Sequence, residues 1–408
     1  MRAIYLFQDE YPWDIRVEKI VSSMINAGIL TTIVSRNRRG LPREERTDSG
    51  IAIRRLPKGL TSIDRNLLNF PAFFSPIWIR ELEKAVIKDS ADILIVRDLP
   101  LSPTAYYVGN KYKIPVIIDM AENYPAMIQD TWQFQGPNPF DYLIRNPILL
   151  RKLERWIIPK LNGIWVVSEA SRRRVEGITG CRNLMWVVGN TPRIQESQAS
   201  KPHPFADMLK TKNALRLLYV GGLEKTRGLQ TVLLSLPIAI KKLGKNIHLL
   251  IVGHGQAIND LKNLVSNLQL DEHVSFAGWV DQQYVPGIIS ASDICLVPHY
   301  VTEHTNTTIP NKIYDYLAQG KPVIVSHAQA LRDIVEELGC GRFYHDHDFE
   351  KLADILVELS NENLRKTLGN AGRAMVLEKY NWQADEKILL KSLEQMIESY
   401  SKNRKTFA

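Results

Sequence analysis

The sequence predicts an α/β protein made of two Rossmann-like domains with parallel sheets. Three observations predict it. The chain has 408 residues, which suits two domains of ordinary size better than one. Strand candidates rich in Val and Ile alternate with helical patterns in two separate series, as in βαβ units. A polar, proline-rich segment over residues 191–213 divides the two series.

The first series occupies the N-terminal half. Its helical patterns fall around 17–27, 77–88, 104–112 and 148–161, between runs that alternate or are fully apolar. The predicted strands are RAIYLF (2–7), LTTIVS (30–35), IAIRRL (51–56), DILIVRD (92–98), PVIIDM (115–120) and GIWVVS (163–168). This succession favours a mostly parallel sheet.

The second series follows the divider and repeats the pattern. Its predicted strands are LRLLYVG (215–221), IHLLIVG (247–253), VSFAG (274–278), DICLVP (293–298) and PVIVS (322–326). Helices are expected around 229–243, 257–268, 284–290, 311–319, 349–359 and 363–379. We therefore divide the chain into a first domain (1–190), a linker (191–213), a second domain (214–380) and a C-terminal amphipathic helix (381–408). That helix either packs in its own domain or crosses back to the first, and spacing alone leaves both open.

Composition indicates an ordinary globular protein of the cytoplasm. Apolar residues make up 45% of the chain and charged residues 24%. No apolar run approaches the ~20 residues of a membrane span, and the N-terminus reaches acidic residues too early for a secretory signal. Cys181, Cys295 and Cys340 lie far apart, which favours a reducing compartment and buried apolar roles over a metal centre.

The formal net charge of +8 leaves three partner classes: nucleic acid, an anionic membrane surface, or anionic substrates. Nucleic acid ranks last, because no zinc finger or aromatic RNA-binding signature occurs. The aromatic, apolar stretch 67–88 could rest peripherally on an anionic bilayer, at the inner face of the membrane. A core-packing lead-in to a helix is the alternative, and it is favoured.

Two glycine-rich turns follow strands of the second domain. In YVGGLEKTRG, Gly221 and Gly222 allow close approach of a ligand, while Lys225 and Arg227 offer cationic donors before a helix. Solvated lysines near such turns are the structural alternative. The turn IVGHGQ adds Gly253, with His254 exposed at its tip.

The segment TIPNKIYDYLAQGKPVIVS predicts a short helix that feeds a buried strand. Pro310 suits the first helical turn and Gly320 a left-handed stop. The helix start also offers the amide of Asn311, the ammonium of Lys312 and, one turn on, the carboxylate of Asp315. Such a start is suited to anions.

Taken together, these motifs resemble the donor-binding half of retaining GT-B glycosyltransferases of the family 4 type, the glycosyl transferases group 1. The resemblance covers the whole second domain. It implies a GT-B fold with two sheets facing a central cleft, an acceptor-binding first domain and a donor-binding second domain. It also implies a UDP- or GDP-linked sugar donor as substrate, with no cofactor and no required metal.

The resemblance assigns roles to residues of the second domain. The basic residue after the first strand, which grips the diphosphate, corresponds to Arg227, with Lys225 beside it. The acidic residue five positions before the helix-stop glycine, which bonds the ribose hydroxyls, corresponds to Asp315.

Two positions depart from the family pattern. Gly222 stands where relatives commonly have arginine, and Thr307 where they commonly have an acid. Glu303 in the preceding loop is a candidate to reach the sugar instead. Thr307, Thr308 and the N–H groups around Asn311 are expected to take over part of the phosphate and sugar contacts.

The first domain resembles the family more weakly. Its first loop and helix place Asp14 and Arg16 as cleft residues near the acceptor, although Asp14 could equally be a helix cap. Arg97, followed by Asp98, ends a predicted strand and is assigned to the same cleft.

The stretch VIIDMAENYPAM carries the catalytic assignment. Many relatives have a sugar-contacting histidine where this chain has Ala121. Glu122 and Asp119 are therefore assigned to the catalytic centre as substrate-positioning groups, beside Asn123.

The implied activity is transfer of a sugar to a glycan or lipid-linked acceptor with retention of anomeric configuration. A nicotinamide dehydrogenase is a rival, but neither first strand leads into G-x-G-x-x-G. A non-catalytic sugar-nucleotide binding protein of the same fold stays open because of the two departures. A GT-B-shaped epimerase or phosphorylase is a further rival, although no lysine is singled out for pyridoxal phosphate.

Overall fold

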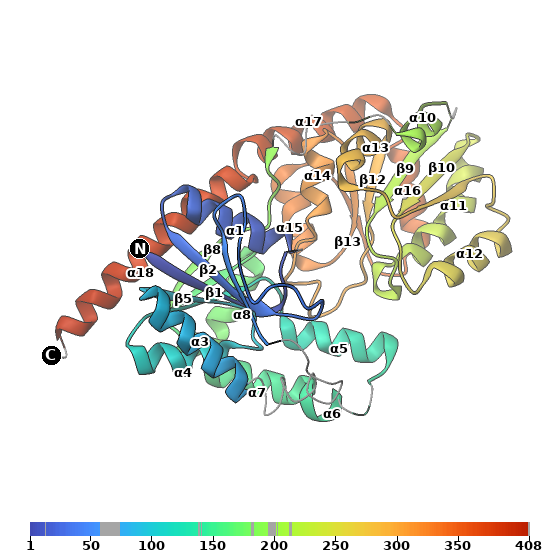
Figure 1. The fold of residues 1–408 in the computed structure, drawn as a ribbon. Coiled ribbons are helices and arrows are strands. Elements are labelled where there is room, and N and C mark those ends of the chain that lie inside the picture. The colour runs from blue at the N-terminus through green and yellow to red at the C-terminus, as the bar shows by residue number, and fades with distance from the viewer. Residues whose placement is uncertain are drawn as a thin grey trace. The chain divides into compact units, whose positions relative to one another are not determined.

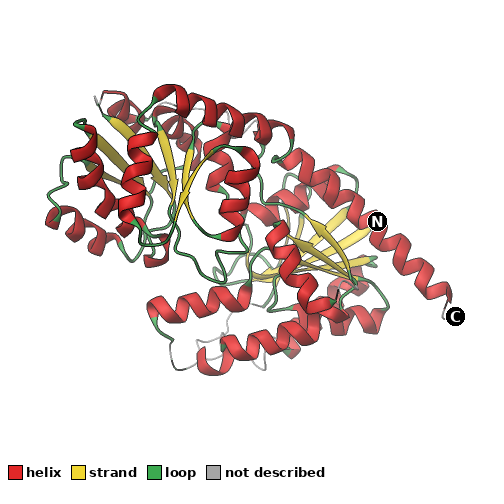
Figure 2. Cartoon of the chain, turned by 180° about the vertical axis from the view of Figure 1, so that it is seen from behind, coloured by secondary structure: helices red, strands yellow, loops and turns green. Residues whose placement is uncertain are grey.

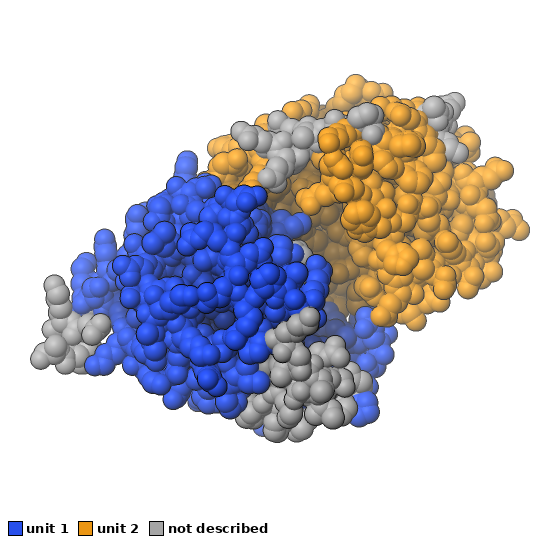
Figure 3. Space-filling view, viewed as in Figure 1, with its two compact units in different colours: residues 1–190, 385–408 blue, residues 191–384 orange. Residues whose placement is uncertain are grey.

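The computed structural model describes residues 1–12, 14–57, 74–137, 139, 141–180, 183–194, 201, 203–211 and 214–406. Contacts divide the chain into two compact units (Figure 3). Unit 1 contains Met1–Asn190 and Asp385–Ala408, and unit 2 contains Thr191–Ala384. Part of the 67–88 stretch, most of the expected linker's centre and Cys181 lie outside the described residues.

Unit 1 is built on an eight-stranded sheet in the order β3-β4-β2-β1-β5-β6-β7-β8. All neighbouring pairs are parallel except β3 with β4, which confirms the predicted parallel sheet. The strands are β1 (Arg2–Glu10), β2 (Leu30–Arg36), β3 (Glu44–Arg46), β4 (Ala52–Arg55), β5 (Ile93–Arg97), β6 (Val116–Met120), β7 (Gly163–Val166) and β8 (Leu184–Val187). Strand β3 was not predicted, because its residues EER are all exposed and show no apolar alternation.

Helices flank both faces of this sheet (Figure 2). They are α1 (Ile15–Asn26), α3 (Pro76–Asp89), α4 (Ser102–Tyr112), α5 (Tyr124–Gln135), α6 (Asp141–Ile144), α7 (Pro147–Ile157) and α8 (Glu169–Thr179), with a 3₁₀ turn η1 at Ile158–Lys160. The strands share one buried core with α3, α4, α5, α7 and α8, and in it Leu94, Ile118 and Ile164 are fully covered. Burial of this apolar surface is the main source of stability for the unit.

Unit 2 carries a six-stranded, all-parallel sheet in the order β11-β10-β9-β12-β13-β14. Its strands are β9 (Leu215–Val220), β10 (Ile247–Val252), β11 (Val274–Gly278), β12 (Ile294–Val297), β13 (Val323–Ser326) and β14 (Gly341–Tyr344). The strand order reverses between β9 and β12. In open α/β sheets, ligands bind at the carboxyl ends of strands at such a switch point.

The helices of unit 2 cover both sides of its sheet (Figure 1), over two buried clusters. They are α10 (Pro204–Thr211), α11 (Leu229–Leu243), α12 (Ile258–Asn267), α13 (Val285–Ala291), α14 (Lys312–Ala318), α15 (Gln329–Leu338), α16 (Phe349–Glu358) and α17 (Glu362–Glu378), with 3₁₀ turns η2 (Lys225–Arg227) and η3 (Gln282–Tyr284). Helix α10 lies inside the expected linker, and its Ala206 and Leu209 are buried in the core. This part of the segment is therefore a packed element of unit 2.

The last helix, α18 (Trp382–Thr406), packs on unit 1 from Asp385 onward. The indole N–H of Trp165 donates to Ser392 Oγ at 2.8 Å, and the Gly189 N–H donates to Asp385 Oδ1 at 3.0 Å. Leu389 and Leu393 are fully buried. No helix in the described ranges is both long enough and apolar enough to cross a membrane.

Candidate functional site

The candidate site lies at the switch point of unit 2, where the loops after β9, β10 and β12 meet. Gly221 and Gly253 end β9 and β10 with φ of +143° and +141°, a backbone region that side chains rarely adopt. A Cβ atom on Gly253 would lie 1.8 Å from the Gly221 carbonyl oxygen. Glycine is therefore required at position 253 for the two turns to touch, and the approach of a ligand to these turns stays a prediction.

Lys312 brings a positive charge to this turn from the start of α14. Its Nζ lies 4.1 Å from the centroid of the Tyr219 ring, within cation–π range. A Cβ atom on Gly221 would lie 2.4 Å from the same Nζ. Burial lowers the pKa of the Lys312 ammonium well below its ordinary value, and the charge of Arg227 lowers it further. An anion placed here would be attracted by both cations.

His299 is a site residue that sequence reasoning missed. It follows β12 and is 1% exposed. The loop that carries Arg227 packs against it, because the Tyr300 N–H donates to Thr226 O at 2.9 Å. Burial, followed by the charges of Lys312 and Arg227, lowers the pKa of His299 well below its ordinary value. The only sequence signal was its place at the end of the strand DICLVP.

Two buried nitrogens of this cluster lack partners. Within the described part of the chain, Nε2 of His299 and Nε of Arg227 are buried without a hydrogen-bond partner. Orphaned buried polar atoms cost about 1–3 kcal/mol each. Their position beside Lys312 suits a ligand that carries anionic oxygens.

Helix α14 begins two residues after Pro310, at Lys312, so it is shorter than predicted. The N–H groups of Ile313 and Tyr314 donate to the carbonyls of Pro310 and Asn311 at 3.1 and 3.0 Å. These two donors are used inside the turn. Asn311 occupies the cap position, Asp315 lies in the first turn, and Gly320 adopts the predicted left-handed stop with φ +67°.

The polar loop before α14 is held together by its own hydroxyl groups. Thr307 is buried, and both its hydroxyl and that of Thr308 donate to the His304 carbonyl at 3.0 Å. Their protons are thus committed within the loop, while their oxygens can still accept. Glu303 is exposed in the same loop.

The remaining residues that are predicted to bind the sugar donor are exposed: Gly222, Lys225 and His254. Lys225 pairs with Asp260 at 3.4 Å, and both side chains are largely exposed. His254 is exposed at the tip of its turn, as predicted, and its carbonyl accepts the Leu223 N–H at 3.0 Å. The Gly222 carbonyl accepts the hydroxyl of Tyr219 at 2.7 Å. The donor assignments of these residues stay predictions.

In unit 1, Asp119 is the centre of a buried ion network. It is 0% exposed and receives hydrogen bonds from Arg16 Nη2 at 2.6 Å, Tyr5 Oη at 2.7 Å and Arg97 Nη1 at 3.1 Å. Burial alone would raise the pKa of Asp119, but Arg16 and Arg97 outweigh it and lower the pKa to about 2. A carboxylate that is buried and fully paired cannot touch a substrate, which argues against its assignment to the catalytic centre and favours a positioning role.

Arg16 is likewise not a surface residue of a cleft. It is 1% exposed and also donates to the Gly189 carbonyl at 2.8 Å. Asp14 is the N-cap of α1, since its carboxylate accepts the N–H groups of Arg16 and Val17. The capping alternative is therefore confirmed. Arg97 forms ion pairs with Asp14 at 3.5 Å and with Asp119 at 3.1 Å.

Asp98 is a second polar residue that the sequence-based assignment left out. It has φ of +54°, and its Oδ1 accepts the N–H groups of Ala121 at 2.9 Å and Glu122 at 3.3 Å. Burial raises the pKa of Asp98 to about 7, against the opposing effect of Arg97. Asp98 thus fixes the turn that carries Glu122 at the carboxyl end of the sheet.

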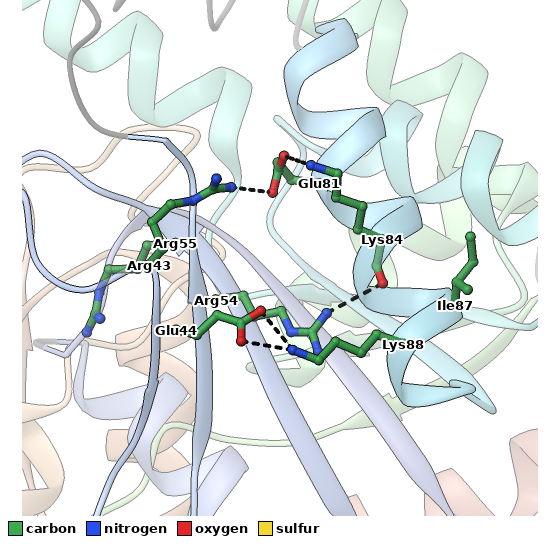
Figure 4. Close-up of a pocket in the computed structure, with 8 residues that line it drawn as sticks. All are labelled: Arg43, Glu44, Arg54, Arg55, Glu81, Lys84, Ile87 and Lys88. Carbon is green, nitrogen blue, oxygen red and sulfur yellow. Dashed lines mark hydrogen bonds and ion pairs between the residues drawn. The ribbon is translucent and has the colours of Figure 1, made fainter.

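A pocket of 560 Å³ lies elsewhere in unit 1, between β3, β4 and α3 (Figure 4). Several of its charged groups form ion pairs within the lining. Arg43 and Lys84 both pair with Glu81 at 2.8 Å, and Lys88 pairs with Glu44 at 2.8 Å. Such exposed pairs are ordinary surface features, and the pocket is not part of the candidate site.

The residues that the structure describes contain no group of His, Cys, Asp and Glu that could hold a metal ion. An Asp-x-Asp sequence does occur at Asp346 and Asp348. Asp348 caps α16 through the Lys351 N–H at 2.8 Å, and Asp346 accepts the Val301 N–H at 2.5 Å. Both carboxylates therefore accept hydrogen bonds from backbone N–H groups, which is a structural role. Cys295 and Cys340 are buried and not in a disulfide, as predicted.

Comparison with known sequences finds a family model that matches most of the second unit. Residues 202–375 match the family model described as glycosyl transferases group 1. An uncharacterized glycosyltransferase of Methanocaldococcus jannaschii is 27% identical over 189 residues, which cover 46% of this chain and 47% of that protein. The alpha-monoglucosyldiacylglycerol synthase of Streptococcus pneumoniae is 25% identical over 289 residues, 64% of this chain and 61% of that protein. The match spans about half to three fifths of these curated relatives.

Solved structures match the whole chain in fold. Sucrose-phosphate synthase from Thermosynechococcus elongatus aligns with a TM-score of 0.78 at 17% identity, over 98% of this chain and 99% of that one. The Anabaena protein HepE, solved in complex with UDP, aligns with a TM-score of 0.69 at 13% identity, over 97% and 100%. The two parallel-sheet units thus form the GT-B fold.

Proposed function

We propose that the protein transfers a sugar from a nucleotide-diphosphate donor. The premise is that residues 202–375 match the glycosyl transferases group 1 family model within a GT-B fold. The observation that carries the proposal is the cluster of two basic side chains, Lys312 and Arg227, with the buried His299 beside them at the turn that carries Gly221. Preorganised cations stabilise charge that develops on a leaving diphosphate. The UDP complex of the structurally similar HepE supports a uridine donor, with GDP as the alternative.

The reaction we propose retains the anomeric configuration and requires no metal. The bond between the anomeric carbon and the phosphate oxygen breaks, and the acceptor oxygen bonds to that carbon from the same face. The acceptor proton passes to the leaving diphosphate. Lys312 and Arg227 hold the diphosphate, and Asp315 bonds the ribose. Exclusion of water limits hydrolysis of the donor.

In this proposal the acceptor is a glycan or a lipid-linked molecule and is bound by unit 1. The diacylglycerol-based name of the streptococcal relative supports the lipid alternative. We place the reaction in the cytoplasm, with the protein peripheral at the inner face of a membrane. Glu122, held by Asp98, is the polar group of unit 1 that we assign to substrate positioning.

The test is a thermal-shift titration of the full chain with UDP, GDP, ADP, their sugar conjugates and NAD, with and without EDTA. A ligand at ~100 times its dissociation constant adds ~2.7 kcal/mol of stability. We expect a shift with one nucleoside diphosphate that EDTA leaves unchanged. Arg227→Ala and Asp315→Ala should reduce the shift, whereas Arg342→Ala should keep it. Arg342 pairs with Glu358 at 2.7 Å at the start of β14 and serves as a matched arginine control.

A second comparison isolates the ribose contact. Wild type should prefer UDP to 2′-deoxy-UDP, and Asp315→Ala should remove that preference, with a weaker residual affinity for both nucleotides. If Asp315→Ala and Arg227→Ala bind nucleotide like wild type, the assigned site is wrong. A shift with NAD alone would favour a dehydrogenase. Donor binding without turnover on any offered acceptor would favour a sugar-nucleotide binding protein.

A further inference from the structure

The first unit exposes apolar side chains along one side of α7. Ile148 is 64% exposed, Leu149 50% and Trp156 52%. These positions recur at the spacing of one helix face, so they lie on one side of α7. The neighbouring exposed positions on that side are basic: Lys152, Arg155 and, just after the helix, Lys160. We call these six residues the α7 face.

The exposure of this face is fixed by the packing of its opposite side. Leu150 and Ile157 are buried in the core of unit 1. Glu154 is buried too, and it accepts two hydrogen bonds from Arg174 at 2.9 and 2.8 Å. Rotation of the helix to hide Trp156 would break this buried pair, which is costly. In Figure 1, α7 lies at the periphery of unit 1 beside α5.

The exposed charges of residues 145–160 are all positive. Residues 145–160 contain five basic residues and a single acid, and that acid is the buried Glu154. The ammonium of Lys160 lies 5.6 Å from the Trp156 ring centroid. An exposed tryptophan next to cations, with aliphatic neighbours and no exposed acid in this segment, is the pattern of helices that lie in the interface of a bilayer.

We propose that the α7 face binds the surface of a membrane rich in anionic lipids. Ile148, Leu149 and Trp156 enter the headgroup boundary, while Lys152, Arg155 and Lys160 meet lipid phosphates. The charge complementarity decides against a second copy of this chain, because a symmetric contact would oppose identical basic faces. The inference rests on the proposed function in one respect: it names the surface that would bring unit 1 to a lipid-linked acceptor. Vesicle binding itself does not depend on that reaction.

The test is co-sedimentation of the full chain with vesicles of phosphatidylcholine, with and without phosphatidylglycerol. Wild type should bind only the anionic vesicles, and less at high salt, because salt screens exposed charges. Lys152→Glu combined with Arg155→Glu should weaken binding at least about 30-fold, since each basic residue near such a surface contributes about a factor of five. Ile148→Ser combined with Trp156→Ser should also weaken it. Trp279→Ser, at the 75% exposed tryptophan of unit 2, is the matched control and should bind like wild type.

The nucleotide-induced thermal shift is measured on the same variants. An unchanged shift shows that they fold and separates this inference from the proposed function, because either can fail alone. The inference is overturned if wild type ignores anionic vesicles, or if the charge-reversal variant binds them as well as wild type. The inference is also overturned if wild type forms a dimer that Trp156→Ser converts to a monomer, because the α7 face would then be a contact between two copies of the chain.

Discussion

The ammonium of Lys312 lies against the backbone of Gly221, so closely that a Cβ atom on the glycine would stand 2.4 Å from Nζ. The two residues come from the loop after β9 and from the start of α14, and they meet at the switch point of unit 2. The glycine is thus required both for its φ of +143° and for the space that the lysine occupies. This relationship makes the position of the charge testable.

Gly221→Ala should displace Lys312 and strain the turn. We expect nucleotide affinity to fall at least about tenfold and the free energy of unfolding to fall by about 1–3 kcal/mol, the cost of a side chain at such φ. Isothermal titration and urea unfolding measure the two effects. Gly244→Ala is the control, because Gly244 has φ of +58° but open space around its Cβ position. It should lose stability without losing nucleotide affinity, and a Gly221→Ala variant that binds normally would contradict the assignment.

His299→Leu should have opposite effects on stability and on binding. Removal of a buried, unpartnered ring nitrogen should leave the apo protein equally stable or up to about 1 kcal/mol more stable, while nucleotide binding weakens. A histidine whose folded pKa is lowered binds its proton mainly in the unfolded state. Wild type should therefore lose stability as pH falls below about 6.5, by up to about 1.4 kcal/mol per pH unit from this group. The variant should lack this part of the slope, and an unchanged slope would rule out a buried neutral His299.

Arg16→Met should unfold unit 1 more easily. The change leaves the buried Asp119 with less compensation and removes the hydrogen bond to the Gly189 carbonyl. Breaking one side of a buried ion pair costs about 3–5 kcal/mol, which denaturant unfolding can measure. Arg38→Met is the control, because Arg38 makes an exposed pair with Asp9. A loss below about 1 kcal/mol for Arg16→Met would mean that the network does not hold the unit together.

Asp98→Asn should change how stability depends on pH. The pKa of about 7 in the folded state lies above the ordinary value of about 3.9, so the folded state binds the proton more tightly. The stability that this group contributes is complete below about pH 4 and is lost as pH rises through 7. Relative to wild type, Asp98→Asn should therefore gain about 2–3 kcal/mol of stability as pH rises from about 5 to about 8. Urea unfolding at both pH values measures this difference, and Asp207→Asn, at an exposed ion pair, should run parallel to wild type.

Much of the fold could be predicted because the signals are local. The strand LRLLYV and the left-handed stop at Gly320 both appear as the sequence indicates. Exposed β3 carries no such periodicity, and α10 was hidden in a polar segment that looked like a linker. Helix α14 was placed correctly but begins at Lys312, because its first turn closes on the carbonyls of Pro310 and Asn311.

The sequence by itself determined the alternation of helices and buried parallel strands, the glycine turns at Gly221 and Gly253, and the basic helix start at Lys312. These follow from backbone preferences and apolar spacing within a few residues. Only the tertiary structure decided that Arg16 and Asp119, 103 residues apart, form a buried pair, that His299 is buried beside Lys312, and that α18 returns to unit 1. Burial and charge pairing arise from contacts between distant segments, so no local pattern could reveal which polar residues face a ligand and which support the core.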